Sequence, residues 1–264
     1  MKPETYRMVA AQEGHYWWHR ARRRMAAALL RRHGLGSGCA WLDLGCGTGG
    51  NLSLLDEFRP RLVTGVDLSP LALEFAHDRA RDASLVRADI SRGLPFADRA
   101  FDVATVFNVM YHAWIESEAA VLSELARVLR AGGLVLLTEP AFAVLAREMD
   151  VAGMARRRYR RMELANMCRA AGLEVLFTSY FTSFGFPLLL GMKAWRRLRV
   201  SRRGARDTKA LDMRPLAPVV NAVFYAVAAG EARLIAEGVV MPVGITLVCV
   251  ARKPAAAQHG GPPQ

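Results

Sequence analysis

Between residues 40 and 138, short and almost wholly apolar segments alternate with stretches of helical character. Apolar runs of this length without polar alternation are typical of strands that are buried on both faces. Strands that alternate with helices favour a parallel sheet covered by helices on both sides. The first strands are predicted at Ala40–Leu44, Leu62–Val66, Leu85–Ala88, Phe101–Phe107 and Leu134–Thr138.

The intervening segments carry helix signals of their own. Ser69 and Pro70 are a typical N-cap and first helical residue, and they predict a helix that runs to about Asp82. An apolar helical face predicts another helix over 116–129, which the two glycines at 132–133 would end. Further helices are expected at 51–58 and 156–171, and further strands at 173–180 and 244–251.

The composition fits one large core. The chain has 264 residues, of which 52% are hydrophobic. The four cysteines show no CxxC spacing, so we expect no metal site and no disulfide framework, as in a cytoplasmic protein. No apolar segment follows the opening residues, which argues against a signal peptide. The tail 254–264 is rich in Ala, Gly and Pro and is expected to be disordered.

The net charge of +12 is unevenly distributed. Residues 1–33 carry eight Lys/Arg and two acids, residues 34–180 carry sixteen and eighteen, and residues 181–243 carry ten and four. A basic surface attracts nucleic acid, anionic lipid or an anionic substrate. Because only four of the cations are lysines, an arginine-rich composition spread over solvated faces accounts for the charge equally well.

A glycine cluster, GCGTGG at 45–50, follows the first predicted strand. Such a turn between a strand and a helix lets a ligand approach the backbone closely. The spacing satisfies both GxGxxG and GxGxG, and either pattern alone is weak evidence. Cys46, inside the cluster, is interpreted as a small packing residue rather than a nucleophile.

Acidic residues at the ends of the first three strands narrow the choice of ligand. Asp43 precedes the glycine cluster, where a carboxylate suits an ammonium group and would repel a pyrophosphate. Asp67 ends the second strand, where it can accept both ribose hydroxyls. Asp89 and Ile90 follow the third strand and can hold an adenine amino group and cover its ring. S-adenosylmethionine (SAM) has an ammonium group and no phosphate. The simpler interpretations are a charge near a helix N-terminus for Asp43 and a turn acid for Asp89.

The series LDLGCGTG, GVDLS, ADI…LPF, FDVATVFNVMYH and ELARVLRAGGLVLLTEP resembles the class I SAM-dependent methyltransferase family, of the small-molecule type. The resemblance covers residues 38–140. It implies an α/β, Rossmann-like core over 38–180, with seven strands that are mostly parallel and an antiparallel last strand over 244–253. It also implies SAM as cofactor, and the cofactor-binding residues would be Asp43, Gly45, Cys46 and Gly47 near the methionine part, Asp67 and Leu68 near the ribose, Asp89 and Ile90 near the adenine, and Asn108 beside the methyl donor.

The N-terminal segment 1–37 is rich in aromatic, imidazole and arginine side chains. It resembles the opening helix of some small-molecule methyltransferases, which lies over the cofactor. This resemblance implies a helical lid that excludes water, with Trp18 and Arg20 against the cofactor. The alternative is an amphipathic helix that packs its aromatic residues on the sheet.

Residues 181–243 form an insertion before the last strand, with two apolar stretches around a basic run at 193–206. Neither stretch reaches 18 residues and prolines interrupt both, so we expect no transmembrane helix. A pair of apolar helices with a cationic turn would suit a substrate cap, a homodimer interface or a peripheral membrane contact.

Methyl transfer from a sulfonium is an in-line displacement, so holding the acceptor in line supplies much of the catalysis. A base is needed only where the acceptor must lose a proton. His112, with Tyr111 beside it, is the leading candidate, followed by His15 and Glu139. A lone histidine is more often structural.

We therefore expect SAM-dependent methyl transfer to O, N or C of a small, lipophilic metabolite. The alternative is non-methylating chemistry such as cyclisation, with SAM as a structural ligand. Nucleic acid is not expected as a partner, because the NVMY sequence at 108–111 differs from the Asn/Asp-Pro-Pro-aromatic motif of base methylation. A nicotinamide oxidoreductase is disfavoured by Asp43 and by the expected antiparallel strand.

Overall fold

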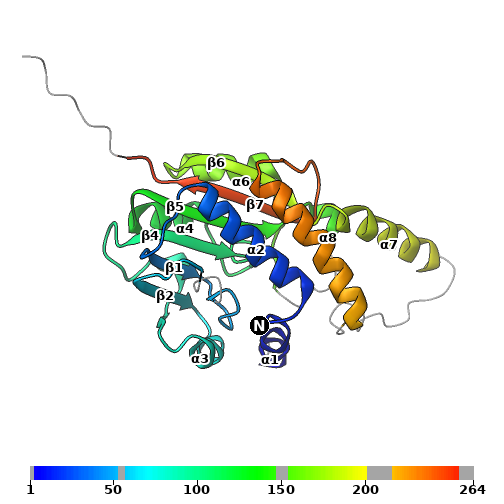
Figure 1. Ribbon diagram of the computed structural model, residues 1–264, viewed down its shortest axis with the longest axis horizontal. Helices are drawn as coiled ribbons and strands as arrows, with labels where there is room; N and C mark the ends of the chain where they lie inside the picture. Colours follow the sequence, from blue (N-terminus) through cyan, green and yellow to red (C-terminus); the bar gives the residue numbers. More distant parts are fainter. Residues whose placement is uncertain (1–2, 53–56, 147–153, 201–215, 256–264) are drawn as a thin grey trace, which may run out of the picture.

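The computed structural model describes residues 3–52, 57–146, 154–200 and 216–255, with backbone alone for 196–200. The strands are β1 (Ala40–Leu44), β2 (Leu62–Asp67), β3 (Ser84–Arg87), β4 (Phe101–Phe107), β5 (Leu129–Pro140), β6 (Glu174–Phe181) and β7 (Thr246–Arg252). They form one sheet in the order β3-β2-β1-β4-β5-β7-β6 (Figure 1). Neighbouring strands are parallel, except that β7 is antiparallel to β5 and to β6. The predicted Rossmann-like sheet with an antiparallel last strand is confirmed.

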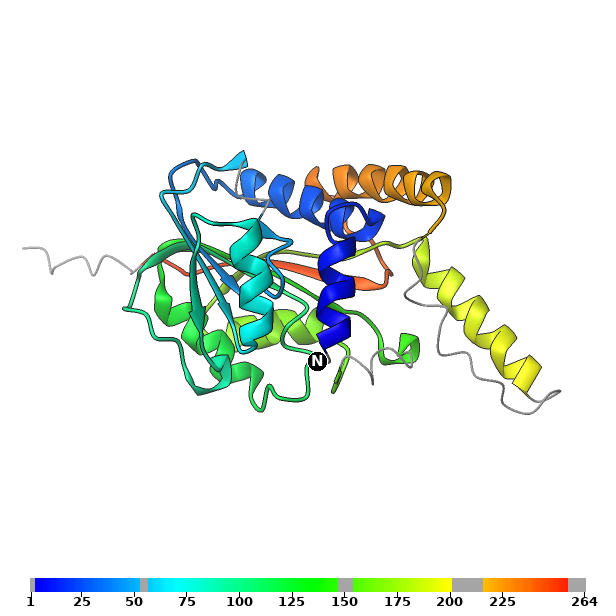
Figure 2. The ribbon, with the colours of Figure 1, turned by 90° about the horizontal axis from the view of Figure 1, so that it is seen from below.

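Helices cover both faces of this sheet (Figures 1 and 2). The helices are α1 (Pro3–Gln12), α2 (Trp17–Arg32), α3 (Pro70–Arg79), α4 (Glu118–Val128), α6 (Arg161–Ala170), α7 (Gly185–Val200) and α8 (Pro218–Ala236), with short 3-10 turns η2 (Ile90–Arg92) and η3 (Ala143–Leu145). Helices α2 and α8 lie side by side on one face, and α4 and α6 pack on the other.

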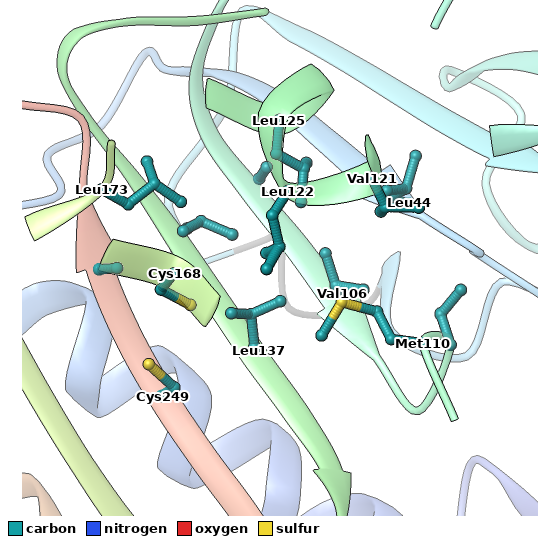
Figure 3. Close-up of a cluster of buried hydrophobic side chains, with 14 of the residues drawn as sticks. Leu44, Val106, Met110, Val121, Leu122, Leu125, Leu137, Cys168, Leu173 and Cys249 are labelled. Carbon is teal, nitrogen blue, oxygen red and sulfur yellow. The ribbon is translucent and has the colours of Figure 1, made fainter. Parts of the chain in front are cut away.

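Each face of the sheet has its own hydrophobic core. On the α4–α6 side, Leu122 and Leu125 of α4 pack with Val106, Leu137 and Cys168, and all five side chains are fully buried (Figure 3). The core on the other side contains the buried residues of α2 and the inner face of α8. Burial on both faces, at roughly 25 cal/mol per Å² of apolar surface, explains why β1, β4 and almost all of β7 are buried continuously rather than at alternate residues.

Some element boundaries differ from the sequence-based prediction. Leu129 has an extended backbone and pairs with Phe101, so β5 starts there and passes through the two glycines that were expected to end the helix. Helix α6 starts at Arg161 rather than at Arg156, because the preceding residues run along the end of β5, where the Tyr159 N–H donates to the Pro140 carbonyl. The predicted helix at 51–58 and the predicted disordered tail lie partly outside the described residues.

The insertion contributes α7 and α8. The Asn221 side chain of α8 joins it to the start of α2, because its Oδ1 accepts the Trp17 N–H at 2.9 Å and its Nδ2 donates to the His15 carbonyl at 3.0 Å. The Trp17 ring contacts Phe184 and Phe224 at centroid distances of 5.6 and 5.4 Å. Contrary to the sequence-based expectation, α8 is long and apolar enough to cross a membrane when judged by length and composition alone.

Candidate cofactor and active site

The carboxyl ends of β1 and β4 lie next to each other where the strand order reverses, which is where ligands bind in open α/β sheets. The glycine turn follows β1 here. Gly45 has φ +72°, and a Cβ on it would lie 2.4 Å from Cγ2 of Val109, in the loop after β4. Gly47 also has a positive φ, +54°. Glycine is therefore required at Gly45 both by the backbone conformation and by the close approach of the neighbouring loop.

Asp67 at the end of β2 is held by the backbone of two loops. Its carboxylate accepts the Gly47 N–H and the Ser69 N–H, both at 2.9 Å. Burial raises the pKa of Asp67, while these hydrogen bonds act in the opposite direction. The carboxylate thereby has one orientation, at the wall of a small hollow.

This hollow brings together residues from the ends of four strands or the loops that follow them. Its lining is Gly45, Asp67, Leu68, Ala88, Asp89, Ile90, Val109, His112 and Trp114. Six of these were predicted from the sequence; Ala88, Val109 and Trp114 were not. Asp89 also caps η2, accepting from the Ser91 N–H at 3.1 Å and from the Ser91 hydroxyl at 2.6 Å. The Ser91 hydroxyl is the main reason that the pKa of Asp89 is lowered.

Asp43 lies within the sheet just before the glycine turn, and it is 2% exposed. Its Oδ1 accepts the Thr105 hydroxyl at 2.8 Å, whereas its Oδ2 is buried without a hydrogen-bond partner among the described residues. Burial raises the pKa of Asp43 to about 7. A buried carboxylate oxygen without a partner is costly, and an ammonium group would satisfy it. The residues present therefore fit the ammonium group of a SAM molecule.

Arg22 of α2 is a buried cation near this carboxylate, and it was missed in the sequence. Its guanidinium lies 4.5 Å from the Trp18 ring centroid and 4.9 Å from that of Phe107, and Nη2 donates to Asn51 Oδ1 at 2.8 Å. Burial lowers the pKa of Arg22 to about 10, and the charge of Asp43 is among those that oppose this shift. Its Nε is buried without a partner among the described residues.

Arg20, which was predicted to contact the cofactor, lies on the other side of α2. Its guanidinium lies 3.9 Å from the Tyr225 ring centroid of α8, and the side chain is exposed. Two residues along an α-helix rotate the side chain by about 200°, so Arg20 and Arg22 face opposite ways. Trp18 faces inward, and its Nε1 donates to the Thr246 hydroxyl at 3.2 Å, beside the end of β5.

The segment between α1 and α2 is tied to the glycine turn by Glu13. Its carboxylate accepts the Thr48 hydroxyl at 2.5 Å and pairs with Arg79 at 2.7 Å, and the side chain is buried. In α1, Tyr6 hydrogen-bonds the Ser69 side chain and lies near the charge of Asp67. The N-terminal segment thus contacts the loops that surround the predicted ribose position.

Glu139 at the end of β5 organises the loop after β4. The fully buried carboxylate accepts the N–H groups of Val109, Met110 and Tyr111 at 3.2, 2.9 and 3.3 Å. Burial raises the pKa of Glu139 to about 8 despite these bonds. All of these contacts are to backbone, so Glu139 positions the loop rather than facing a substrate.

That loop carries the other predicted residues. Asn108 has φ +58°, and its Oδ1 accepts the Thr138 hydroxyl at 3.2 Å. His112 is nearly buried between aromatic neighbours, with centroid distances of 4.0 Å to Tyr111 and 3.9 Å to Trp114. His15, in contrast, is exposed in the turn between α1 and α2.

Cys46 is buried, and burial raises the pKa of its thiol well above the usual range. A neutral, buried thiol is a poor nucleophile, which agrees with the interpretation of Cys46 as a packing residue.

The doubly wound sheet, the glycine turn after β1, the acid at the end of β2 and the buried Asp43 oxygen, which has no partner in the described part of the chain, together define a class of nucleoside-binding domain whose ligand carries an ammonium group. Residues 42–137 match the family model described as a methyltransferase domain. This part of the chain is a class I SAM-dependent methyltransferase domain.

Curated relatives match parts of the chain. A fatty-acid O-methyltransferase of Mycolicibacterium smegmatis is 41% identical over 101 residues, which are 37% of this chain and 36% of that protein. A phthiotriol/phenolphthiotriol dimycocerosates methyltransferase of Mycobacterium ulcerans is 34% identical over 133 residues, which are 48% of each chain. The matched part of the chain thus spans about a third to a half of the length of these relatives.

Among solved structures, the cyclase SpnF aligns with a TM-score of 0.60 at 22% identity. The alignment covers 96% of this chain and 94% of that one. At this level of identity the likeness shows a shared fold over almost the whole chain.

Proposed function

We propose that the chain binds SAM and transfers its methyl group to O, N or C of a small, lipophilic acceptor. The observation that carries the proposal is the pair of acids at the carboxyl ends of β1 and β2. Asp43 offers an ammonium group a buried oxygen that has no hydrogen-bond partner within the ranges the structure describes, and Asp67 is held at the wall of the hollow by two backbone N–H groups. A pyrophosphate next to Asp43 would meet a like charge.

The proposed cofactor contacts extend from these two acids around the hollow. Asp67 and Leu68 would hold the ribose, and Asp89 with Ile90 would hold the adenine, since they line the hollow beyond Asp67. Near the buried Asp43, the guanidinium of Arg22 would balance the carboxylate of the methionine part. When bound, SAM supplies an electrophilic methyl group on sulfur. The chain's own residues hold and orient the two reactants and exclude water.

Aromatic side chains support a lipophilic acceptor. The Phe142 ring, after the end of β5, contacts Tyr180 at 4.6 Å and Phe186 at 5.2 Å between centroids. Together with Trp114 at the hollow they would give an acceptor apolar walls. By their names, the two curated relatives described above act on a fatty acid and on phthiotriol or phenolphthiotriol dimycocerosates, which agrees with this class of acceptor.

His112 is the proposed base for acceptors that must lose a proton, with Tyr111 beside it. Its ring is oriented by the two aromatic contacts and lines the hollow. His15 drops out of the proposed site because of its exposed position. The N-terminal segment is the proposed lid, since Glu13 fastens it to the glycine turn.

The fold shared with a cyclase makes non-methylating chemistry the second candidate, with SAM as a structural ligand. Binding and methyl transfer therefore need separate measurements.

The first test is calorimetric titration of the purified chain with SAM, S-adenosylhomocysteine and NAD. We expect micromolar binding of both adenosyl ligands and no NAD binding. Binding of NAD alone, or of none of the three, contradicts the proposal. Labelled SAM with a panel of fatty acids, phenols and amines then tests transfer. SAM binding without any methylated product in that panel favours the second candidate.

A further inference from the structure

The outward face of α8 lacks the polar residues that a solvent-exposed helix normally carries. Its exposed large side chains are Val219, Val220, Val223, Val227 and Leu234. At 3.6 residues per turn these five fall within about 100° of the helix circumference, so they form one stripe. Ala222, Ala226 and Gly230 beside the stripe are also exposed, and Arg233 is the charged residue of this outer face.

The opposite face of α8 is packed against the rest of the described chain. Ala228, Ala232 and Ile235 are buried in the core shared with α2. The buried carboxylate of Glu231 accepts the N–H and the hydroxyl of Ser183 at about 3 Å. A helix that is packed on one side and apolar on the exposed side can lie in the plane of an interface.

Arginines border the apolar stripe. Helix α2 contains no acidic residue, and it lies beside α8 in the same outer layer (Figure 2). A groove between the two helices is lined by five arginines and one glutamate: Arg20, Arg23, Arg24, Arg31, Arg233 and Glu57. Arg31 pairs with Glu57 and Arg233 with Glu237, whereas Arg24 makes no ion pair with any residue that the structure describes. The groove therefore keeps a net positive charge.

We propose that the outer face of the α2–α8 layer docks on an anionic lipid surface, with the apolar stripe in the interface and the groove arginines on the headgroups. Charge complementarity selects this occupant over a second copy of the chain. A two-fold contact through this face would bring two arginine-lined grooves together, whereas anionic headgroups neutralise them. Helix α8 begins beyond the sheet edge at which β4 and β5 end (Figure 1).

The test is co-sedimentation of the full chain with vesicles of phosphatidylcholine, with and without about 30 mol% phosphatidylglycerol. We expect binding to the anionic vesicles that weakens at high salt. Val223→Asn with Val227→Asn, and separately Arg24→Glu with Arg233→Glu, should each lower the partition coefficient by about tenfold or more. These residues lie outside the proposed cofactor site, so the SAM affinity measured by calorimetry should stay unchanged. An unchanged affinity would show that the variants are folded.

Two control substitutions lie on α6, on the opposite face of the sheet. Met162 is 56% exposed, close to the 54% of Val223, and Arg169 is an exposed arginine. Met162→Asn and Arg169→Glu should leave vesicle binding unchanged. If the chain does not bind the anionic vesicles, or if the α6 and α8 variants behave alike, the proposal is overturned. A dimer in sedimentation velocity that the two valine substitutions dissociate, without vesicle binding, would assign this face to a second copy instead. None of these outcomes depends on methyl transfer.

Discussion

The carboxyl edge of the sheet and the α2–α8 layer are assembled in different ways. At the edge, Asp43, Gly45 and Asp67 each follow from a local strand–turn pattern, and the parallel sheet brings the strand ends together. The layer joins helices about 200 residues apart, through contacts such as Asn221 to Trp17. The first region has a recognisable motif. The second has only amphipathic patterns, which do not indicate which other helix or strand packs against them.

The two regions should also differ in how well they tolerate substitutions. A site built by close backbone approach should fail on the addition of one methyl group, whereas the outer side of the layer carries exposed side chains such as Val223 and Val227. Substitutions in the two regions should therefore differ sharply in their effect on stability and on SAM binding.

Gly45→Ala should have the largest effect. The added Cβ meets Val109 at 2.4 Å in a backbone conformation that L-residues avoid, which should cost about 3 kcal/mol of unfolding free energy. Urea denaturation measures it. Gly36→Ala is the matched control, because nothing lies within 4 Å of its Cβ position. Adding Val109→Ala should restore part of the loss. Equal stability of the two alanine variants would show that the turn is not constrained.

Asp67→Ala should weaken SAM binding by about a hundredfold, because it removes the proposed ribose acceptor. This change in affinity corresponds to about 2.7 kcal/mol of binding free energy. Titration calorimetry measures the affinity, and circular dichroism checks the fold. Asp98→Ala, which removes an exposed acid paired with Arg127, serves as the control. Unchanged affinity in Asp67→Ala would remove Asp67 from the site.

Asp43→Asn should weaken SAM binding by about tenfold or more at pH near 8 and abolish most of its pH dependence. In the folded chain the pKa of Asp43 is raised to about 7, so the carboxylate that binds an ammonium group is lost as the pH falls through 7. Affinity for SAM in the unsubstituted chain should therefore decrease below pH 7. A flat affinity profile between about pH 6 and pH 8 would contradict this role.

The same substitution also tests the stability of the fold, whose dependence on pH should run in the opposite direction to that of SAM affinity. A carboxyl whose pKa is raised on folding favours the folded state only while it is protonated, so its contribution is lost as the pH rises from about 4 to about 7. Asp43→Asn should make the unfolding free energy less dependent on pH over this window and raise it at pH near 8. Thermal melts across pH compare the two chains. A lower melting temperature of the variant at pH near 8 would be the contrary result.

Two neighbouring positions of α8 give the most direct contrast, and one of them has the smallest expected effect. Val227 is 48% exposed, and Val227→Asn should change the unfolding free energy by less than about 0.5 kcal/mol. Ala228 is fully buried, and Ala228→Asn should cost about 2 kcal/mol, because it places an amide in the core. Denaturation of both variants checks the packing of α8, and similar costs would mean that α8 is not seated as described.

The site residues also divide into those that a local motif predicts and those whose role depends on contacts between distant parts of the chain. Asp43, Asp67 and Asp89 could be predicted because they lie at or next to the carboxyl ends of strands, at motif spacing. Glu13 and Glu139 stabilise the loops of the same site, yet Glu13 was not singled out and Glu139 was considered only as a base. Neither role has a local signature, since each depends on contacts with Thr48 or with the Val109 loop, about thirty residues away.

Arg20 and Arg22 show how easily a sequence-based prediction selects the wrong one of two nearby arginines. Both lie in one run of arginines, and the sequence-based interpretation chose the one that faces outward. The inward phase of α2 is set by Met25, Leu29 and Leu30, which are fully buried, and Arg22 lies on their side of the helix. A helical-wheel argument from these residues would have favoured Arg22.

The sequence by itself determined the alternation of strands and helices, the glycine turn and the acids around it, whereas the antiparallel direction of the last strand was implied by the family resemblance. These depend on hydrophobic period and on residues next to one another in the chain. Only the tertiary structure decided which arginine enters the site, that Glu139 holds the loop carrying His112, and which face of α8 stays exposed. Such choices depend on burial and on partners far apart in sequence, and apolar patterning alone does not distinguish one partner from another.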